Sequence, residues 1–285
     1  MNVLGIDFTS RPKRRKPITC LHCTLDGDLL RAGELEEWPD FTLFEQALRI
    51  PGPWIAGIDF PFGQSRRFIE TIGWPSNWAD YVLHANALGR DGFRAALDAY
   101  RAVRPSGDKE HRRQTDIAAK SISPQKLYGV PVGLMFFEGA PRLIASGVTI
   151  PHLRVGDPNR IVVEAYPGVL ARQIIGRRGY KNDTRKKQTA DHREARFDLL
   201  TALVNGVLHD RYGLFVDARQ ELCEDPGGDH LDALLCAVQA AWAWKNRSHG
   251  YGAPDQIDPL EGWIADPCSP SSEMSREARS AQDRV

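Results

Sequence analysis

The chain has 285 residues, and 42% of them are hydrophobic, so it can bury one large core or two smaller ones. Its 37 basic and 37 acidic residues give a formal net charge of zero, which excludes a protein whose overall field selects a charged partner. The five cysteines show no disulfide-framework spacing, and neither a signal-peptide pattern nor a membrane-length apolar run is present. We therefore expect a cytoplasmic protein without a membrane segment.

The first sixty residues predict four strands and one helix. The strands are expected over residues 3–8, 18–24, 29–35 and 54–60, and the helix over residues 41–50. Asp26-Gly27, between the second and third strand-like runs, is typical of a hairpin turn. The order therefore predicts three antiparallel strands, a helix, and a fourth strand that is parallel to the first.

The rest of the chain predicts a long insertion, one more sheet strand and two long helices. The insertion covers about residues 64–158 and is expected to be mainly helical, with helices over 78–88 and 93–103 and a small hairpin from 134–137 and 143–145. A fifth strand over 160–166, helices over 189–208 and 229–245, and a short strand over 214–218 follow. We expect one domain over residues 1–267 and a disordered tail over 268–285.

A short repeat marks the candidate functional site. Gly5-Ile6-Asp7-Phe8 is echoed by Gly57-Ile58-Asp59-Phe60, and each copy places one aspartate at the end of a strand that should be buried. Burying a charge costs several kcal/mol unless it is paired or binds a metal ion. Because adjacent strands would set these two carboxylates side by side, their repulsion predicts a cation between them.

Three further acidic residues belong to the same hypothesis. Glu164 ends the predicted fifth strand, and Asp229 and Asp232 are three residues apart, so they share one face of a helix. Carboxylate oxygens are the ligands that Mg²⁺ and Mn²⁺ prefer. Two such ions about 4 Å apart would activate water and stabilise the leaving oxygen of a phosphodiester.

Each acidic residue also has a purely structural interpretation. Asp229 follows three helix-breaking residues and could be an N-cap, with Asp232 in the first turn of the helix. Asp7 and Asp59 could each begin a turn, and Glu164 could pair with an arginine. The combination of these positions with the strand order favours a shared site, because together they follow a ribonuclease H-like pattern: a mixed five-stranded sheet in the order 3-2-1-4-5, flanked by helices.

The chain resembles the predicted ribonuclease H-like nucleases known as domain of unknown function 429. The resemblance covers roughly residues 2–267 and is carried by Gly5-Ile6-Asp7, Gly57-Ile58-Asp59-Phe60-Pro61, Glu164-Ala165-Tyr166-Pro167, Asp229-His230-Leu231-Asp232-Ala233-Leu234 and Glu261-Gly262-Trp263-Ile264, followed by Pro267. It implies a ribonuclease H-like fold and a metal-dependent nuclease. Asp7, Asp59, Glu164, Asp229 and Asp232 would be catalytic, and all of these except Asp229 would bind Mg²⁺ or Mn²⁺. Where this chain has Ala165 and Tyr166, family members often carry His, so one possible proton shuttle is missing.

Basic residues supply the candidate contacts to DNA or RNA. Residues 172–196 contain nine Lys or Arg against three acidic residues, and the insertion holds a second basic group. The candidates are Arg112, Arg113, Lys120, Lys181, Arg185, Lys186 and Lys187. The alternative interpretation of such runs is solvated surface.

Two other functions remain open at this point. A phosphotransferase of the actin and sugar-kinase type also begins with an Asp-bearing strand, and residues 5–10 would suit a phosphate loop, but such an enzyme needs two ribonuclease H-like units and an adenosine loop. A catalytically silent binding protein that keeps the fold is the third possibility. The sequence specifies neither the nucleic acid nor the oligomeric state.

Overall fold

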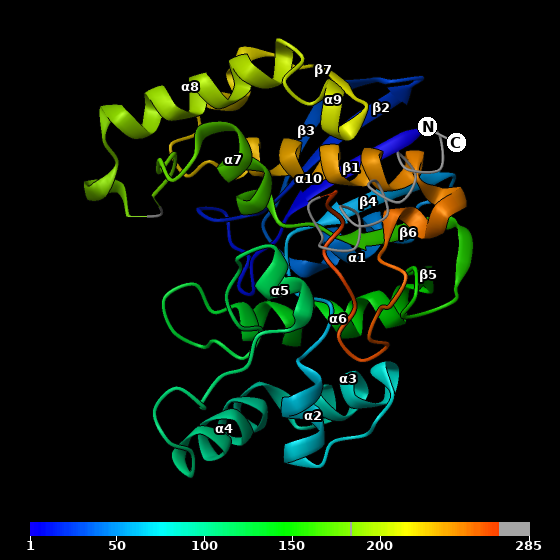
Figure 1. Cartoon of the computed structure of the whole chain (residues 1–285). Helices are drawn as coiled ribbons and strands as arrows, with labels where there is room; N and C mark the ends of the chain where they lie inside the picture. The colour runs from blue at the N-terminus through cyan, green and yellow to red at the C-terminus, as the bar shows by residue number, and fades with distance from the viewer. Residues whose placement is uncertain (183, 268–285) are drawn as a thin grey trace, which may run out of the picture.

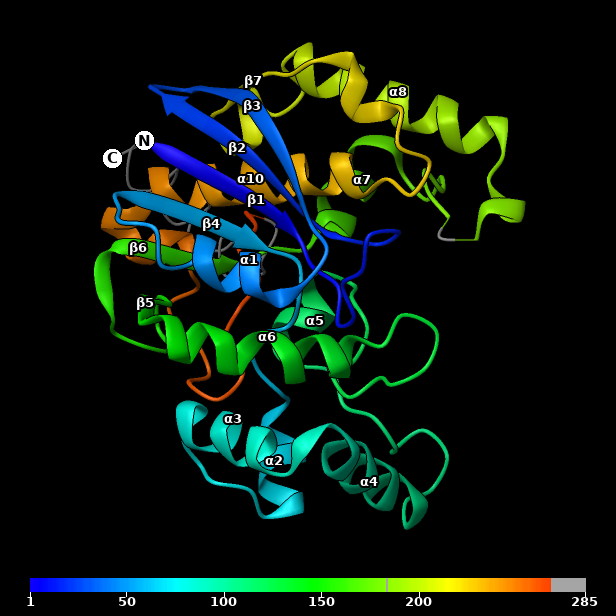
Figure 2. The same cartoon turned by 180° about the vertical axis from the view of Figure 1, so that it is seen from behind.

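The fold is a mixed α/β structure built on one seven-stranded sheet (Figures 1 and 2). The computed structural model describes residues 1–182 and 184–267. The strands are β1 (Asn2–Asp7), β2 (Ile18–Asp26), β3 (Leu29–Trp38), β4 (Trp54–Ile58), β5 (Val148–Thr149), β6 (Asp157–Glu164) and β7 (Phe215–Asp217). Their spatial order is β5-β6-β4-β1-β2-β3-β7.

The pairing directions bring the C-terminal ends of three parallel strands to the same end of the sheet. β1 is parallel to β4 and β4 is parallel to β6, whereas β1, β2 and β3 form an antiparallel meander. The register pairs Gly5 with Gly57 and Ile6 with Ile58, so the two copies of the sequence repeat lie directly side by side. Asp7 and Asp59 therefore lie side by side at the C-terminal ends of β1 and β4, and this end of the sheet carries the candidate site.

The sheet differs from the predicted one in its number of strands. The five predicted sheet strands correspond to β1–β4 and β6, which are neighbours in the order β3-β2-β1-β4-β6. Two short strands, β5 and β7, extend the sheet at its two edges, parallel to β6 and β3. β5 has two residues, too few for a period-two pattern to appear in the sequence. β7 lies within the predicted short strand over 214–218.

Helices cover both faces of the sheet. The helices are α1 (Phe41–Ala47), α2 (Arg66–Ile72), α3 (Trp78–Ala87), α4 (Gly89–Ala102), α5 (Gln114–Ala118), α6 (Val132–Ser146), α7 (Pro167–Ile175), α8 (Ala190–Val204), α9 (His209–Tyr212) and α10 (Asp229–Lys245), with 3₁₀ turns at Arg185–Lys187, Gln220–Cys223 and Arg247–Gly252. α7, α8 and α10 lie on one face, and α1 lies on the other (Figures 1 and 2). α2 to α6 form the predicted helical insertion, which extends below the sheet in both views.

Alternation along the strands builds a separate core on each face. On β1, Val3 belongs to the core beneath α10, whereas Leu4 and Ile6 belong to the core shared with α1 and α6. Both cores are dominated by residues with almost no exposed surface. Such burial contributes about 25 cal/mol for each Å² of apolar surface that leaves water.

Two glycines allow α10 to lie unusually close to the sheet. A Cβ atom at Gly5 would lie 1.8 Å from the carbonyl oxygen of Ala233, and one at Gly57 would lie 2.3 Å from that of Cys236. Both distances are too short for any side chain, so the glycine of each Gly-Ile-Asp copy determines where the helix packs. Asp232 is one helical turn before Cys236, on the same helix face, and is thereby brought to the strand ends.

The predicted hairpin within the insertion is wrong. Residues 132–146 form the single helix α6, although it contains both Gly139 and Pro141. A Cβ at Gly139 would lie 2.4 Å from the ring of Phe60, so this glycine permits close packing and is not part of a turn. Tertiary contact thus overrides the local breaker signal.

The expectations about membrane segments and cysteines can be compared with the described residues. No helix among residues 1–182 and 184–267 combines the length and the apolar character needed to cross a bilayer. The four cysteines described, Cys20, Cys23, Cys223 and Cys236, are buried free thiols. The predicted tail over residues 268–285 lies outside the described residues.

Candidate metal centre

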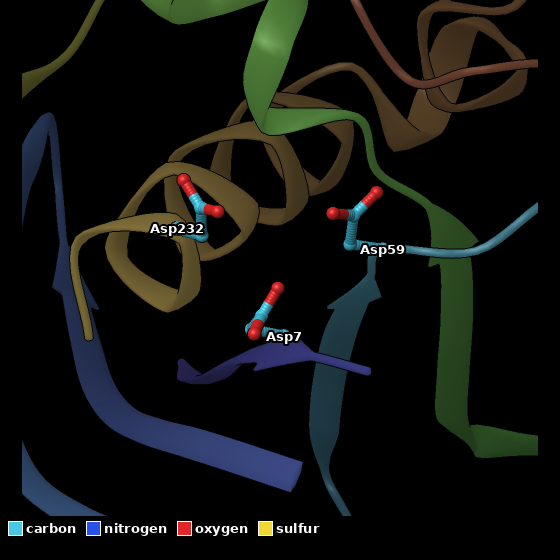
Figure 3. A group of neighbouring side chains, drawn as sticks. All are labelled: Asp7, Asp59 and Asp232. Carbon is cyan, nitrogen blue, oxygen red and sulfur yellow. The ribbon is translucent and has the colours of Figure 1, made fainter. Parts of the chain in front are cut away.

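Three aspartates from three different parts of the chain converge at the C-terminal ends of β1 and β4. Asp7 is the last residue of β1, Asp59 follows β4, and Asp232 lies in the first turns of α10. Each offers a carboxylate oxygen, and these three oxygens all lie within 4.8 Å of one another. Figure 3 shows the three carboxylates directed toward a common space between the strand ends and the helix.

Burial makes this aspartate triad costly in its ionised form. Asp7 and Asp232 are buried, and Asp59 is half-buried. Burial, together with the charges of Asp229 and Asp232, raises the pKa of Asp7 well above its usual value. Burial likewise raises the pKa of Asp59 to about 7, although Lys181 opposes this shift. The metal-free site therefore tends to retain protons that isolated aspartates would lose at neutral pH.

Asp232 is held by two partners from the segment before α8. The Tyr180 hydroxyl donates to one carboxylate oxygen of Asp232 at 2.6 Å, and the Lys181 ammonium donates to the other. Lys181 comes from the predicted nucleic-acid segment, but here it serves the triad as a counter-ion. Its positive charge favours the ionised forms of Asp7 and Asp59 as well. Sequence spacing gave no sign of this role, because 51 residues separate Lys181 from Asp232.

Asp229 lies at the margin of the triad. After burial, the charge of Asp229 is the largest cause of the raised pKa of Asp7. The Lys16 ammonium donates to the Asp229 carboxylate at 3.4 Å. The N-cap interpretation of Asp229 is wrong: the cap position is Gly228, and the Asp225 carboxylate accepts the Asp229 backbone N–H at 2.7 Å. The Asp229 side chain is thus left free of any capping role.

Glu164 lies apart from the triad, in a buried ion network. The Arg113 guanidinium donates to both of its carboxylate oxygens, at 2.6 and 2.8 Å, and also binds Asp116. The Phe62 backbone N–H donates to Glu164 at 2.8 Å. The structural interpretation of Glu164, pairing with an arginine, therefore describes its contacts. Through Phe62 it holds the turn that follows Asp59.

The predicted nucleic-acid residues have different environments. Arg113 is 1% exposed and its guanidinium is committed to two carboxylates, an environment that does not favour the predicted contact to nucleic acid. Arg112, Lys120, Lys186 and Lys187 are exposed. The side chain of Arg185 lies outside the described part of the structure.

A cleft opens beside Asp59. It has a volume of about 220 Å³, and Asp59, Lys181 and Tyr166 contribute to its walls together with apolar residues of the insertion such as Val130 and Met135. Arg113 and Glu164 also reach its wall. Of the triad, Asp59 is the member that lines this cleft, on the insertion side.

The triad meets the basic requirement for binding a divalent cation. Two oxygens bound to one ion at 2.0–2.6 Å lie at most about 4–5 Å apart, which matches the 4.8 Å limit between the triad oxygens. Hard carboxylate oxygens suit Mg²⁺ or Mn²⁺, and a bound ion would relieve the repulsion that, after burial, raises the pKa of Asp7. Asp7, Asp59 and Asp232 are the residues that would hold it.

The family of the chain is established by comparison. Residues 5–256 match the family described as "Protein of unknown function (DUF429)", so the chain belongs to that family. No curated protein matches the chain. No solved structure matches it either.

Proposed function

We propose that this protein is a metal-dependent nuclease of the ribonuclease H-like class, which hydrolyses phosphodiester bonds in DNA or RNA. The observation that carries the proposal is the convergence of Asp7, Asp59 and Asp232 within 4.8 Å, from two parallel strands and one helix. Three carboxylates gathered in a buried place destabilise the fold unless a cation compensates them. The chain nevertheless builds this cluster with two closely packed glycines, which argues for a functional reason.

The order of strands supports the ribonuclease H-like part of the proposal. An antiparallel meander of β1 to β3 is followed by a helix and by two strands parallel to β1, with the first acidic residue at the end of β1. α10 then places the last acidic residue against the same strand ends. β5 and β7 are additions at the sheet edges.

The residues of this chain divide into ligands and supporting groups. Asp7, Asp59 and Asp232 would hold Mg²⁺ or Mn²⁺, which when bound supplies charge neutralisation for the phosphodiester and activation of water. Tyr180 orients Asp232 by its 2.6 Å hydrogen bond. Asp229, which Lys16 contacts in the metal-free site, would be the ligand for the second ion of the two-ion scheme. Glu164 is a positioning residue for the turn after Asp59, because it accepts the Phe62 N–H.

The charge of Lys181 is important for the metal-free state. Its ammonium group contacts Asp232 and compensates part of the triad charge. A divalent ion must compete with this contact, so metal affinity should depend on Lys181. Replacing Lys181 with Met removes the competing charge and keeps most of the aliphatic stem.

The test is cleavage of labelled nucleic acids with Mn²⁺, Mg²⁺ or EDTA. Single-stranded and duplex DNA and RNA of one sequence are compared, and cleavage is expected with at least one substrate only when a divalent ion is present. Asp7→Asn should abolish it, whereas the control Asp80→Asn, an exposed aspartate of α3, should not. Absence of cleavage on all substrates, with metal binding intact, would favour a silent binding protein. ATP binding and phosphoryl transfer in a parallel assay would favour the phosphotransferase.

A cytoplasmic location remains a prediction.

A further inference from the structure

The connection between β1 and β2 carries a dense basic cluster that the sequence-based nucleic-acid prediction did not include. Five of the six residues from Arg11 to Lys16 are Arg or Lys. Arg11, Lys13, Arg14 and Arg15 are exposed, and Lys16 is half-buried. We call residues 11–16 the basic loop. Figures 1 and 2 show the dark blue connection projecting beyond the ends of β1 and β2.

The basic loop has a defined conformation. The Lys13 N–H donates to the Lys16 carbonyl at 3.0 Å, and the Lys16 N–H donates to the Lys13 carbonyl at 2.9 Å. This pair of bonds closes a two-residue turn with Arg14 and Arg15 at its tip. Pro12 and Pro17 flank the turn and restrict its backbone further, since proline fixes φ near −65°. The backbone that presents the two tip arginines therefore has little conformational entropy left to lose on binding.

Contacts at both ends fix the basic loop beside the triad. Lys16 donates to Asp229 of α10, and Arg90 of α4 donates to the carbonyl of Ser10 at 3.1 Å. Arg11 follows Asp7 by four residues, so their Cα atoms are at most about 14 Å apart, from an extended-chain rise of about 3.5 Å per residue. The loop thus begins within reach of a phosphate strand that has one phosphodiester at the triad.

The charge of the basic loop is largely uncompensated. Among the described residues, Arg11, Lys13, Arg14 and Arg15 form no ion pair, so their charges face solvent. The basic segment over 172–196 differs, because Arg178 pairs with Glu194 and Asp198 and Lys181 pairs with Asp232. In a chain of zero net charge, the loop is a local positive field next to an acidic site.

We propose that the basic loop binds the phosphate backbone of the nucleic acid and holds the strand across the triad, a proposal that rests on the proposed nuclease function. Arginine forks bind phosphate oxygens in a bidentate way, and such contacts position a strand without reading its sequence. The position of the loop beside the triad favours nucleic acid over an anionic membrane surface. The loop also lacks the large apolar side chains with which interfacial segments enter a bilayer.

The test measures binding separately from cleavage. Fluorescein-labelled 30-nucleotide DNA and RNA, single-stranded and duplex, are titrated in EDTA at several salt concentrations. Arg14→Ala/Arg15→Ala should weaken binding and flatten the slope of log K against log salt by about 1.4–1.8 units, from about 0.7–0.9 for each lost phosphate contact. Arg14→Lys/Arg15→Lys, which keeps the charge, should retain most of the slope.

A matched control carries the same loss of charge elsewhere. Arg49 and Arg94 are exposed and lie outside the basic loop, and Arg49→Ala/Arg94→Ala should leave the slope unchanged. Equal slopes for wild type and Arg14→Ala/Arg15→Ala would overturn the proposal, as would an equal loss in the control. Binding to phosphatidylserine vesicles that depends on the loop, without binding to any oligonucleotide, would also overturn it. A wild-type protein that binds through the loop but cleaves nothing with Mn²⁺ would refute the nuclease function alone.

Discussion

Replacing Asp7 with Asn tests the metal centre before any substrate is known. Asp7 is buried at the end of β1 and is repelled by Asp229 and Asp232, and these effects raise its pKa well above the usual value. Asparagine keeps the shape of the side chain but removes its charge and a strong metal ligand. The metal-free Asp7→Asn protein should therefore be as stable as wild type or slightly more stable.

The size of the metal effect follows from linkage. An ion that binds only the folded protein stabilises it by RT ln(1 + [L]/Kd), which is about 2.7 kcal/mol at a hundredfold excess over Kd. For a domain of this size, about 2–4 °C in Tm corresponds to each kcal/mol, so Mn²⁺ should raise the Tm of wild type by about 5–10 °C. Asp7→Asn should lose this rise together with Mn²⁺-dependent cleavage.

Melting curves of wild type and Asp7→Asn, each with Mn²⁺ and with EDTA, decide the question. The control Asp80→Asn should show the full Mn²⁺ shift. A structural aspartate would give the opposite pattern: the substitution would lower the metal-free Tm, and Mn²⁺ would shift wild type and Asp7→Asn equally. That outcome would refute the metal centre.

Three further predictions concern packing, protonation and the buried ion network. Gly57→Ala places a Cβ 2.3 Å from the Cys236 carbonyl oxygen and should therefore displace α10. The substitution should lower the free energy of unfolding by about 1–3 kcal/mol, measured by urea denaturation, and reduce the Mn²⁺ shift of Tm. A full Mn²⁺ shift would contradict the packing argument. In EDTA, raising the pH from 5 to 8 should lower the stability of wild type relative to Asp59→Asn. The reason is that folded Asp59, with a pKa of about 7, retains a proton that the unfolded chain has already released, and the difference should level off above pH 7. Urea denaturation at several pH values measures it, and a pH-independent difference would exclude the raised pKa. Arg113→Ala leaves Glu164 and Asp116 as buried carboxylates without a counter-ion, so it should lower the free energy of unfolding by about 3–5 kcal/mol. A loss below about 1 kcal/mol in urea denaturation would contradict the importance of this ion network.

The sequence was most informative where local pattern and function coincide. The Gly-Ile-Asp repeat indicated both strands and their acidic ends, and the structure pairs Gly5 with Gly57 in register. A buried strand that ends in an aspartate is recognisable because apolar periodicity stops at a charge. The function of the glycines was not recognisable, because it depends on how closely α10 lies above the sheet.

The long-range partners could not be predicted from the pattern. Glu164 and Arg113 are 51 residues apart, and nothing in either local sequence distinguishes an arginine inside a buried network from one on the surface. The same limit applies to Lys181, which looked like part of a solvated basic run. Residue type and spacing identify groups that are able to carry charge, whereas the partner of each group is set by the tertiary fold.

The acidic residues where the strands end therefore lie in two different environments, although they looked equivalent in the sequence. Glu164 accepts from a guanidinium and a backbone N–H, and these contacts oppose the rise in its pKa that burial causes. Asp7 and Asp59 have raised pKa values, because burial and neighbouring carboxylates outweigh the charge of Lys181. A carboxylate with satisfied partners stabilises the fold, whereas one without them is available to a cation from solution. By this criterion Asp7 and Asp59 are the carboxylates open to a cation, whereas Asp232 is already held by Tyr180 and Lys181 and joins the candidate metal centre by its position within 4.8 Å of them. Glu164 supports the turn after Asp59.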